Sequence, residues 1–131
     1  MDRPQGWLKV AFAAGALTDA LALVPMLSPP MARLLWGIET SAPSYLFAMG
    51  YGASLMLGWT LLLVWAYQAP VERRAIALLT LVVIAGLASA EVVAVTIGAI
   101  TLARVAPTWV LQAALAALFG IGYVTSGRPR T

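Results

Sequence analysis

The sequence contains neither cysteine nor histidine. The absence of cysteine excludes disulfide bonds and thiol chemistry, and the absence of histidine excludes Ser-His-Asp triads and most zinc sites. Haem held by histidine is excluded for the same reason. We therefore expect no metal ion and no other cofactor, and the residue types that enzymes use most often for catalysis are largely missing.

Charged residues are scarce as well: they make up 10% of the 131 residues, whereas 62% are hydrophobic. Soluble domains carry roughly 25% charged residues, and a soluble chain this short could not bury so much apolar side chain. The excess is expected to face a lipid bilayer. The net charge of +3 does not indicate nucleic-acid binding, because the basic residues are few and scattered. They are better explained as topology signals beside membrane spans.

Four apolar stretches are long enough for a spanning helix, which needs ~20 residues, and they lack the alternation of membrane β-strands. They cover residues 7–27, 45–67, 75–102 and 108–124. The sequence therefore predicts an all-α membrane protein, a single transmembrane domain over residues 1–131 built as a four-transmembrane-helix bundle. Residues 1–27 also resemble a cleavable signal peptide. The cleavage site of such a peptide consists of small residues, and here the charged Asp19 would lie directly before it, which is unusual. We therefore interpret this segment as the first span.

Prolines mark the connections between the predicted spans. Ser28 is followed by Pro29 and Pro30, and proline disfavours a helical conformation in the residue before it, so the first helix should end here. Residues 31–37 are expected to form one or two turns at the membrane surface. Pro107 would begin the fourth helix, because proline is favoured at the first helical position.

Lysine and arginine are unequally divided between the two sides of the predicted bundle. Six lie on the side of the termini, namely Arg3, Lys9, Arg73, Arg74, Arg128 and Arg130. Only Arg33 and Arg104 lie on the other side. Because cytoplasmic loops carry the excess of positive charge, both termini should face the cytoplasm, in the cytoplasmic membrane of a prokaryote.

Small residues, with two polar ones among them, recur every four positions on each predicted helix. The four stripes are Ala11, Gly15 and Asp19; Gly50, Ser54 and Gly58; Gly86, Ala90, Ala94 and Gly98; and Gln112, Ala116 and Gly120. Such stripes let helix backbones approach closely in lipid. We expect them to pack inside the bundle. A stripe that faced outward would instead join the chain to a homo-oligomer or a larger membrane complex.

Polar residues from different helices are expected to meet in the outer half of the bilayer. A rise of 1.5 Å per residue places Asp19 ~12 Å and Glu91 ~6 Å below the outer surface. Gln112 and Tyr51 fall at similar depths, and Arg104 could reach toward Glu91. Because membrane-embedded charges are costly, these five are the candidate ligand-binding residues. Three alternatives stay open: interhelical hydrogen bonds that fix the bundle's register, a ligand or ion pocket, and catalysis.

The stretch from Tyr45 to Arg74 carries three distinctive segments. They are Ala48-Met49-Gly50-Tyr51-Gly52, Leu55-Met56-Leu57-Gly58-Trp59-Thr60 and Pro70-Val71-Glu72-Arg73-Arg74. On these segments the chain resembles an uncharacterised group of small prokaryotic four-helix membrane proteins known mainly as hypothetical proteins. The resemblance implies four spans and no particular activity. The small multidrug-resistance transporters are similar in size and in having an acid in the first helix, but their motif is absent around Asp19, so that likeness is architectural.

These patterns predict a small polytopic membrane protein that is not an enzyme and has an accessory or assembly role. The alternative is a proton- or ligand-coupled carrier or binding protein with an outward-facing polar site at Asp19 and Glu91. A water-accessible outer cavity lined by both acids would favour the carrier. A dry, fully packed interior would favour the structural role.

Overall fold

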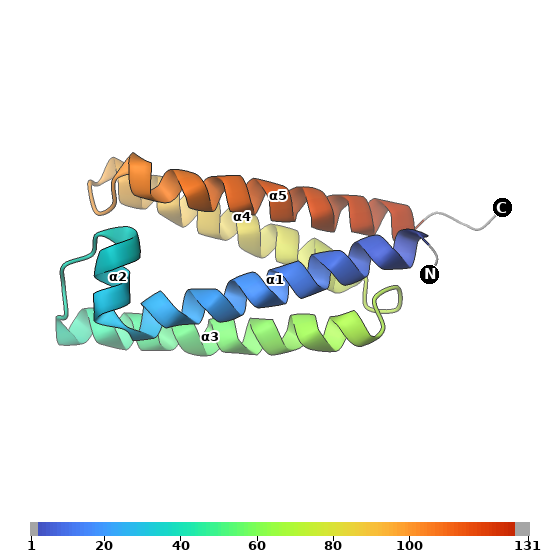
Figure 1. Ribbon diagram of the computed structural model, residues 1–131, viewed down its shortest axis with the longest axis horizontal. Helices are drawn as coiled ribbons and strands as arrows, with labels where there is room; N and C mark the ends of the chain where they lie inside the picture. Colours follow the sequence, from blue (N-terminus) through green and yellow to red (C-terminus); the bar gives the residue numbers. More distant parts are fainter. Residues whose placement is uncertain (1–2, 128–131) are drawn as a thin grey trace.

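The computed structural model describes residues 3–127, which fold into five α-helices (Figure 1). The helices are α1 (Arg3–Leu27), α2 (Pro29–Trp36), α3 (Pro43–Gln68), α4 (Ala75–Thr96) and α5 (Leu102–Ser126). No strand occurs in this part of the chain. All helices except the short α2 are long and apolar enough to cross a membrane. The predicted all-α bundle with four membrane-spanning helices is therefore confirmed.

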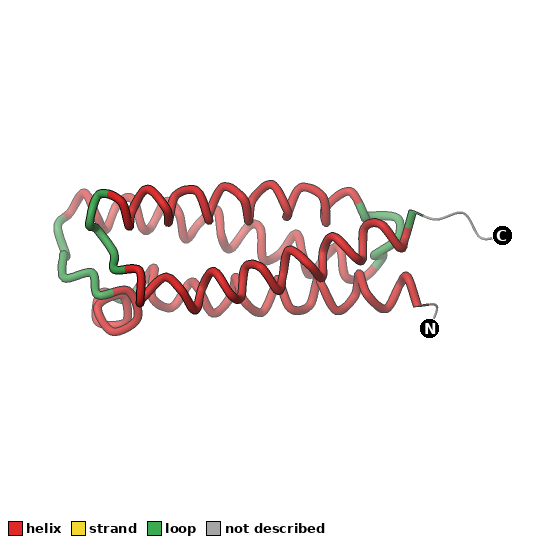
Figure 2. Tube along the Cα trace, turned by 90° about the horizontal axis from the view of Figure 1, so that it is seen from above, coloured by secondary structure: helices red, strands yellow, loops and turns green. Residues whose placement is uncertain are grey.

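The four long helices run side by side, and α1 is central among them (Figures 1 and 2). It packs against α3 on one side and α5 on the other, and α4 packs against α5. Although α3 and α4 are joined by a tight turn, they make at most marginal contact. The ends of the described chain and the α3–α4 turn lie together at one end of the bundle, the termini end. We call the opposite end, which holds α2 and the α4–α5 turn, the α2 end.

The tightest packing lies toward the termini end. Phe12 of α1 and Phe119 of α5 are fully buried and meet edge to face, with ring centroids 5.8 Å apart. A Cβ added at Gly15 would lie 2.9 Å from Cζ of Phe119, so these two helices touch across a glycine. At the α2 end, by contrast, residues 81–96 of α4 are all at least partly exposed. The bundle is therefore closed at the termini end and looser at the α2 end.

The boundaries of α4 and α5 differ from those expected from the sequence. The predicted third span continues to residue 102, but α4 ends at Thr96 because Gly98 adopts a left-handed conformation with φ of 75°. The N–H groups of Gly98 and Ala99 bond back to the carbonyls of Val95 and Ala94, the hydrogen-bond pattern of a Schellman cap. α5 begins at Leu102 rather than near residue 108.

The early start of α5 changes the positions expected for Pro107, which was predicted to begin the helix, and for Arg104, which precedes it. Pro107 does not open α5 but lies within it. Arg104 belongs to its first turn. The four-span count survives, because only the division of residues between the third and fourth helices changes.

The interfacial turns predicted after the first span form the eight-residue helix α2, which lies across the α2 end of the bundle. It starts at Pro29 and ends where Gly37 takes a left-handed conformation with φ of 71°. Nη1 of Arg104 donates to the carbonyl oxygens of Leu34 at 2.5 Å and Arg33 at 3.5 Å. A cation is favourable there, because the last carbonyls of a helix have no partners within it. Arg104 therefore fastens α2 to α5.

Three cations at the termini end each lie over an aromatic ring from another part of the chain. The distances to the ring centroids are 5.6 Å for Lys9 over Tyr67, 3.7 Å for Arg73 over Trp65, and 5.2 Å for Arg74 over Tyr123. Such pairs are typical of a membrane surface, where one side of a ring is apolar and the other is wet. Arg128 and Arg130, which contribute to the predicted charge bias, lie outside the described residues, as does the side chain of Arg3.

The small-residue stripes divide into two groups. That of α1 faces the bundle as expected, since Ala11 and Gly15 are buried. On α5 Gln112 is buried, but Gly120 is half-buried and a Cβ added there would meet nothing within 4 Å. Those of α3 and α4 do not face the bundle, which corrects the expectation of intramolecular packing. Gly50 and Gly58 of α3 and Gly86 and Ala90 of α4 are exposed, and a Cβ added at any of the three glycines would meet nothing within 4 Å.

Candidate functional site

A polar pair joins α4 to α5 in the half of the bundle toward the α2 end. Nε2 of Gln112 donates a hydrogen bond of 3.0 Å to Oε1 of Glu91. The Gln112 side chain belongs to the buried face of α5 that also carries Leu115 and Phe119, since three- and four-residue steps return to the same side of a helix. Only 9% of Gln112 is exposed, whereas Glu91 is half-buried. Two of the predicted site residues are therefore brought together directly.

This pair leaves several hydrogen-bonding atoms unused. Oε2 of Glu91 and Oε1 of Gln112 are buried acceptors without a partner. Trp109, one turn before Gln112 on α5, lies against the Glu91 carboxyl group. Its indole N–H is a buried donor directed to this carboxyl group. Because an unpaired buried polar group costs ~1–3 kcal/mol, the unused acceptor oxygens of this pair indicate a site that could accept a further hydrogen-bond donor.

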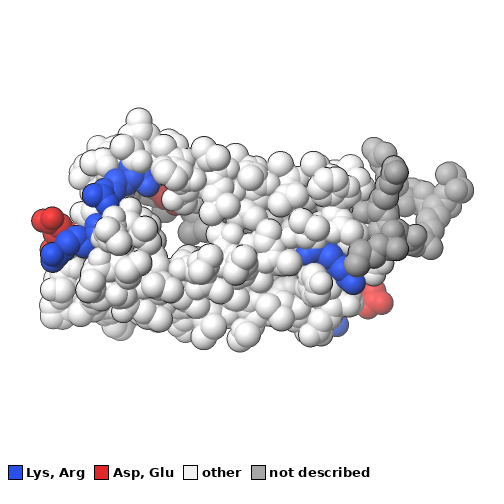
Figure 3. Space-filling view, viewed as in Figure 1, with Lys and Arg blue, Asp and Glu red and all other residues white. Residues whose placement is uncertain are grey.

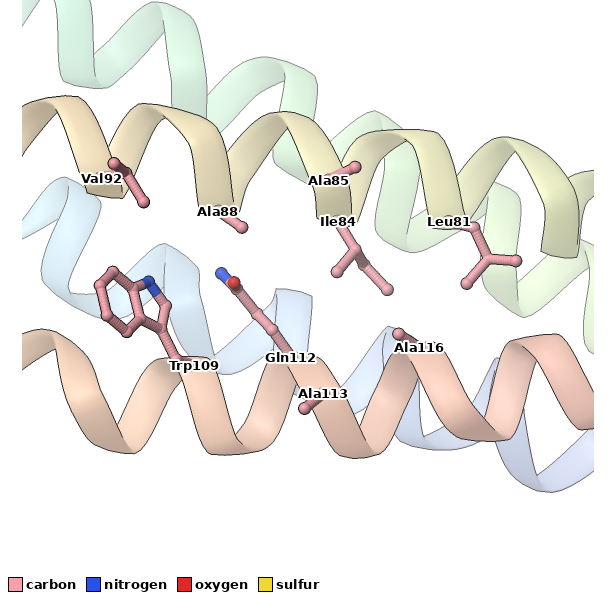
Figure 4. A pocket seen from close by; sticks show the side chains of 9 residues that line it. All are labelled: Leu81, Ile84, Ala85, Ala88, Val92, Trp109, Gln112, Ala113 and Ala116. Atoms are coloured by element: carbon pink, nitrogen blue, oxygen red, sulfur yellow. The ribbon is translucent and has the colours of Figure 1, made fainter.

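A cavity of about 420 Å³ lies along the α4–α5 seam beside this pair. Figure 4 shows the side chains that line it: Leu81, Ile84, Ala85, Ala88 and Val92 from α4, and Trp109, Gln112, Ala113 and Ala116 from α5. Apart from the indole of Trp109, Gln112 has the only polar side chain in this lining, and the other residues are aliphatic. The cavity is thus an apolar groove with a polar group on its wall, which we call the α4–α5 groove.

Asp19 lies on the inner face of α1, at a level close to that of the Glu91–Gln112 pair. It is one turn beyond Gly15, which contacts Phe119, so it sits ~6 Å from that contact toward the α2 end. Gln112 is seven residues from Phe119 in the same direction, or ~10 Å. Asp19 is half-buried. Figure 3 shows the molecular surface hollowed between α1, α2 and α5, with acidic and basic atoms at the edge of the hollow.

Two of the predicted site residues lie elsewhere. Tyr51 is 67% exposed and packs against Phe47 on the same helix, with ring centroids 6.1 Å apart, so it faces away from the polar pair. Arg104 is directed to the last carbonyls of α2 rather than to Glu91. Trp109 was not among the residues predicted for the site. Its spacing of three from Gln112, which places both on one helical face, was the available signal.

The arrangement is suited to binding by hydrogen bonds and apolar contact. Within residues 3–127, no three acidic side chains come together in a way that could hold a metal ion. The polar groups of the candidate site are two separate carboxylates, an amide and an indole, and the chain has no histidine or cysteine. No protein family, curated protein or solved structure matches the chain.

Proposed function

We propose that the protein is a non-enzymatic membrane protein that binds a small ligand at a polar site formed by Glu91 and Gln112, with Asp19 across the interior. The observation that carries this proposal is the set of buried, unpartnered hydrogen-bonding atoms around Glu91. A purely structural hydrogen bond would use the polar atoms it buries, because leaving them unpaired lowers stability. Here the bond between the two side chains leaves one oxygen of each free.

The uneven packing of the bundle supports the same proposal. Phe12 and Phe119 close the interior at the termini end, whereas α4 is loosely covered toward the α2 end. We further propose that the termini face the cytoplasm of a prokaryotic cell, on the basis of the lysine and arginine bias. The site would then open to the outside. This orientation suits a binding protein or a carrier in its outward-open state.

Single-cysteine labelling tests the proposal cleanly, because the chain has no cysteine of its own. We expect a membrane-impermeant thiol reagent applied to intact cells to label Asp19→Cys and Glu91→Cys. The reason is that water must reach both positions from the outer side. Labelling is measured as the mass increase of the purified variant. Protection of both positions would contradict an outward-facing polar site.

Three further variants serve as controls for that experiment. Glu39→Cys, in an exposed loop at the α2 end, should be labelled in intact cells, and Gln68→Cys at the termini end only after the membrane is permeabilised. The opposite pattern would reverse the proposed orientation without removing the site. Ala11→Cys, which is fully buried, should stay unlabelled in both conditions.

An accessory or assembly role is the second candidate function, and the outward stripes of α3 and α4 favour it. Small residues on an exposed helix face permit close approach of another membrane helix. Ser54 lies between Gly50 and Gly58 on this face, so Ser54→Cys should form a disulfide-linked dimer in native membranes under mild oxidation if a second copy packs there. Leu55→Cys, also exposed on α3 but turned about 100° around the helix from Ser54, is the matched control. A monomer in both variants would leave no support for self-assembly through α3.

A further inference from the structure

The short helix α2 forms one wall of the hollow between α1, α2 and α5. It contacts both α1 and α5, the two long helices that flank the hollow, and it bounds the hollow toward the α2 end (Figures 1 and 3). In the proposed orientation this end of the bundle faces the outside. α2 therefore lies between the hollow and the water on the outer side of the membrane.

Little apolar packing holds α2 in this place. It is joined to α1 by the single extended residue Ser28, and it is followed by residues 37–42, which form no regular structure. Among its eight residues only Ala32 is buried, whereas Leu34 and Leu35 are 67% and 47% exposed. Segments with few buried apolar contacts open at low cost in free energy. Movement of α2 as a unit about Ser28 is therefore weakly opposed by packing.

Arg104 makes the polar attachment between α2 and α5. Its Nη1 donates to the last carbonyl oxygens of α2, those of Arg33 and Leu34. Its side chain lies against the end of the helix, since a Cβ added to Gly37 would be 3.1 Å from Nε of Arg104. Among the described residues, these are the hydrogen bonds that join α2 to α5. One guanidinium group therefore fastens a loosely packed helix to the far wall of the hollow.

We propose that α2 is a strap that opens and closes the outer side of the hollow, with Arg104 as its latch. When the hydrogen bonds of Arg104 are made, α2 bridges α1 and α5 and restricts the passage of water and solutes to the polar site. When they are broken, α2 moves away about Ser28 and the hollow widens. The inference rests on the function proposed for Glu91, Gln112 and Asp19, and it adds the control of access to that site.

The rate of thiol labelling at Asp19→Cys in intact cells measures the opening of the strap. Adding Arg104→Gln removes the charged donor, and hydrogen bonds from charged donors are the stronger ones. We expect this change to raise the labelling rate by a membrane-impermeant reagent at least about fivefold.

Arg33→Gln is the matched control for the latch. It removes one positive charge from the same end of the bundle, but the Arg33 side chain is exposed and only its backbone carbonyl accepts from Arg104. This variant should leave the labelling rate at Asp19→Cys unchanged. Equal labelling rates in the Arg33 and Arg104 variants would overturn the latch.

The distance between α2 and α5 supplies a second readout that does not depend on the polar site. Spin labels at Leu35→Cys and Val110→Cys, both exposed, report this distance by pulsed electron paramagnetic resonance on the full chain in detergent micelles. Arg104→Gln should add a longer distance to the distribution. Labels at Leu17→Cys and Val110→Cys, which join α1 to α5, should keep their distance and show that the bundle remains folded. An unchanged distance between α2 and α5 would overturn the strap.

The two measurements separate this inference from the proposed function. If Asp19→Cys stays unlabelled in every variant but Arg104→Gln lengthens the distance between α2 and α5, the outward-facing site fails and the latch stands. If Asp19→Cys is labelled at the same rate with and without Arg104, the strap fails and the proposed site stands.

Discussion

Replacing Gly15 by leucine is expected to destabilise the bundle by ~1–3 kcal/mol or more, the usual range for overpacking a well-packed interior. A Cβ alone would lie 2.9 Å from Cζ of Phe119 and 3.1 Å from Cδ1 of Leu63. Both neighbours are fully buried, so they have little room to move aside. Helices in lipid associate through close packing rather than through a hydrophobic force between them, so separating α1 from α5 removes much of what holds them together. The free energy of unfolding in mixed SDS micelles is the measurement.

Gly58 provides the matched control for this substitution. It lies in the middle of α3, as Gly15 lies in the middle of α1, but a Cβ added there meets nothing within 4 Å. Gly58→Leu should therefore leave the free energy of unfolding unchanged or raise it slightly, since leucine favours helix more than glycine does. Equal losses in the two variants would mean that the face of α3 around Gly58 is covered, which would favour an oligomer.

Replacing both Glu91 and Gln112 by leucine is expected to yield a protein more stable than either single variant. Gln112→Leu removes the donor of the 3.0 Å bond and leaves a carboxyl group in the seam with one partner fewer. Glu91→Leu leaves a buried amide without its acceptor. Each single change should cost ~1–3 kcal/mol, whereas removing both partners is often neutral or stabilising. Unfolding in SDS, measured on all four proteins of the double-mutant cycle, yields the coupling energy.

The neighbouring pair Ala88 and Ala113 is the control for this cycle. Both line the groove, and neither carries a side-chain polar group, so their leucine variants should show little coupling through hydrogen bonding. If the effects of Glu91→Leu and Gln112→Leu simply add, the two side chains do not interact in the membrane. The site would then lose its central bond.

The two polar residues of the site were identifiable from the sequence because charge and amide groups are rare within apolar spans. Glu91 and Gln112 were expected at similar depths on different helices, since depth follows from the rise per residue. The sequence did not show in which direction each side chain points from its helix. Helices that are apolar all round carry little information about which face meets a neighbour, and for that reason Tyr51 was grouped with residues from which it faces away.

The sequence by itself determined the helical class, the number of long apolar helices and the short helix after the first of them. Runs of apolar residues must satisfy their backbone hydrogen bonds internally in lipid, and proline and glycine set many of the helix ends. Gly98 was a readable stop signal for α4, although the apolar run past it concealed the boundary.

Only the tertiary structure decided which helices touch. The four small-residue stripes have the same spacing, yet that of α1 packs within the bundle, that of α5 is buried at Gln112 but open at Gly120, and those of α3 and α4 face outward. Spacing places residues on a common face, but the partner of that face depends on how side chains such as Phe119 fit against Gly15 in three dimensions. The incomplete set of hydrogen bonds around Glu91 likewise exists only where α4 and α5 meet, because the bond to Gln112 spans 21 positions of the chain.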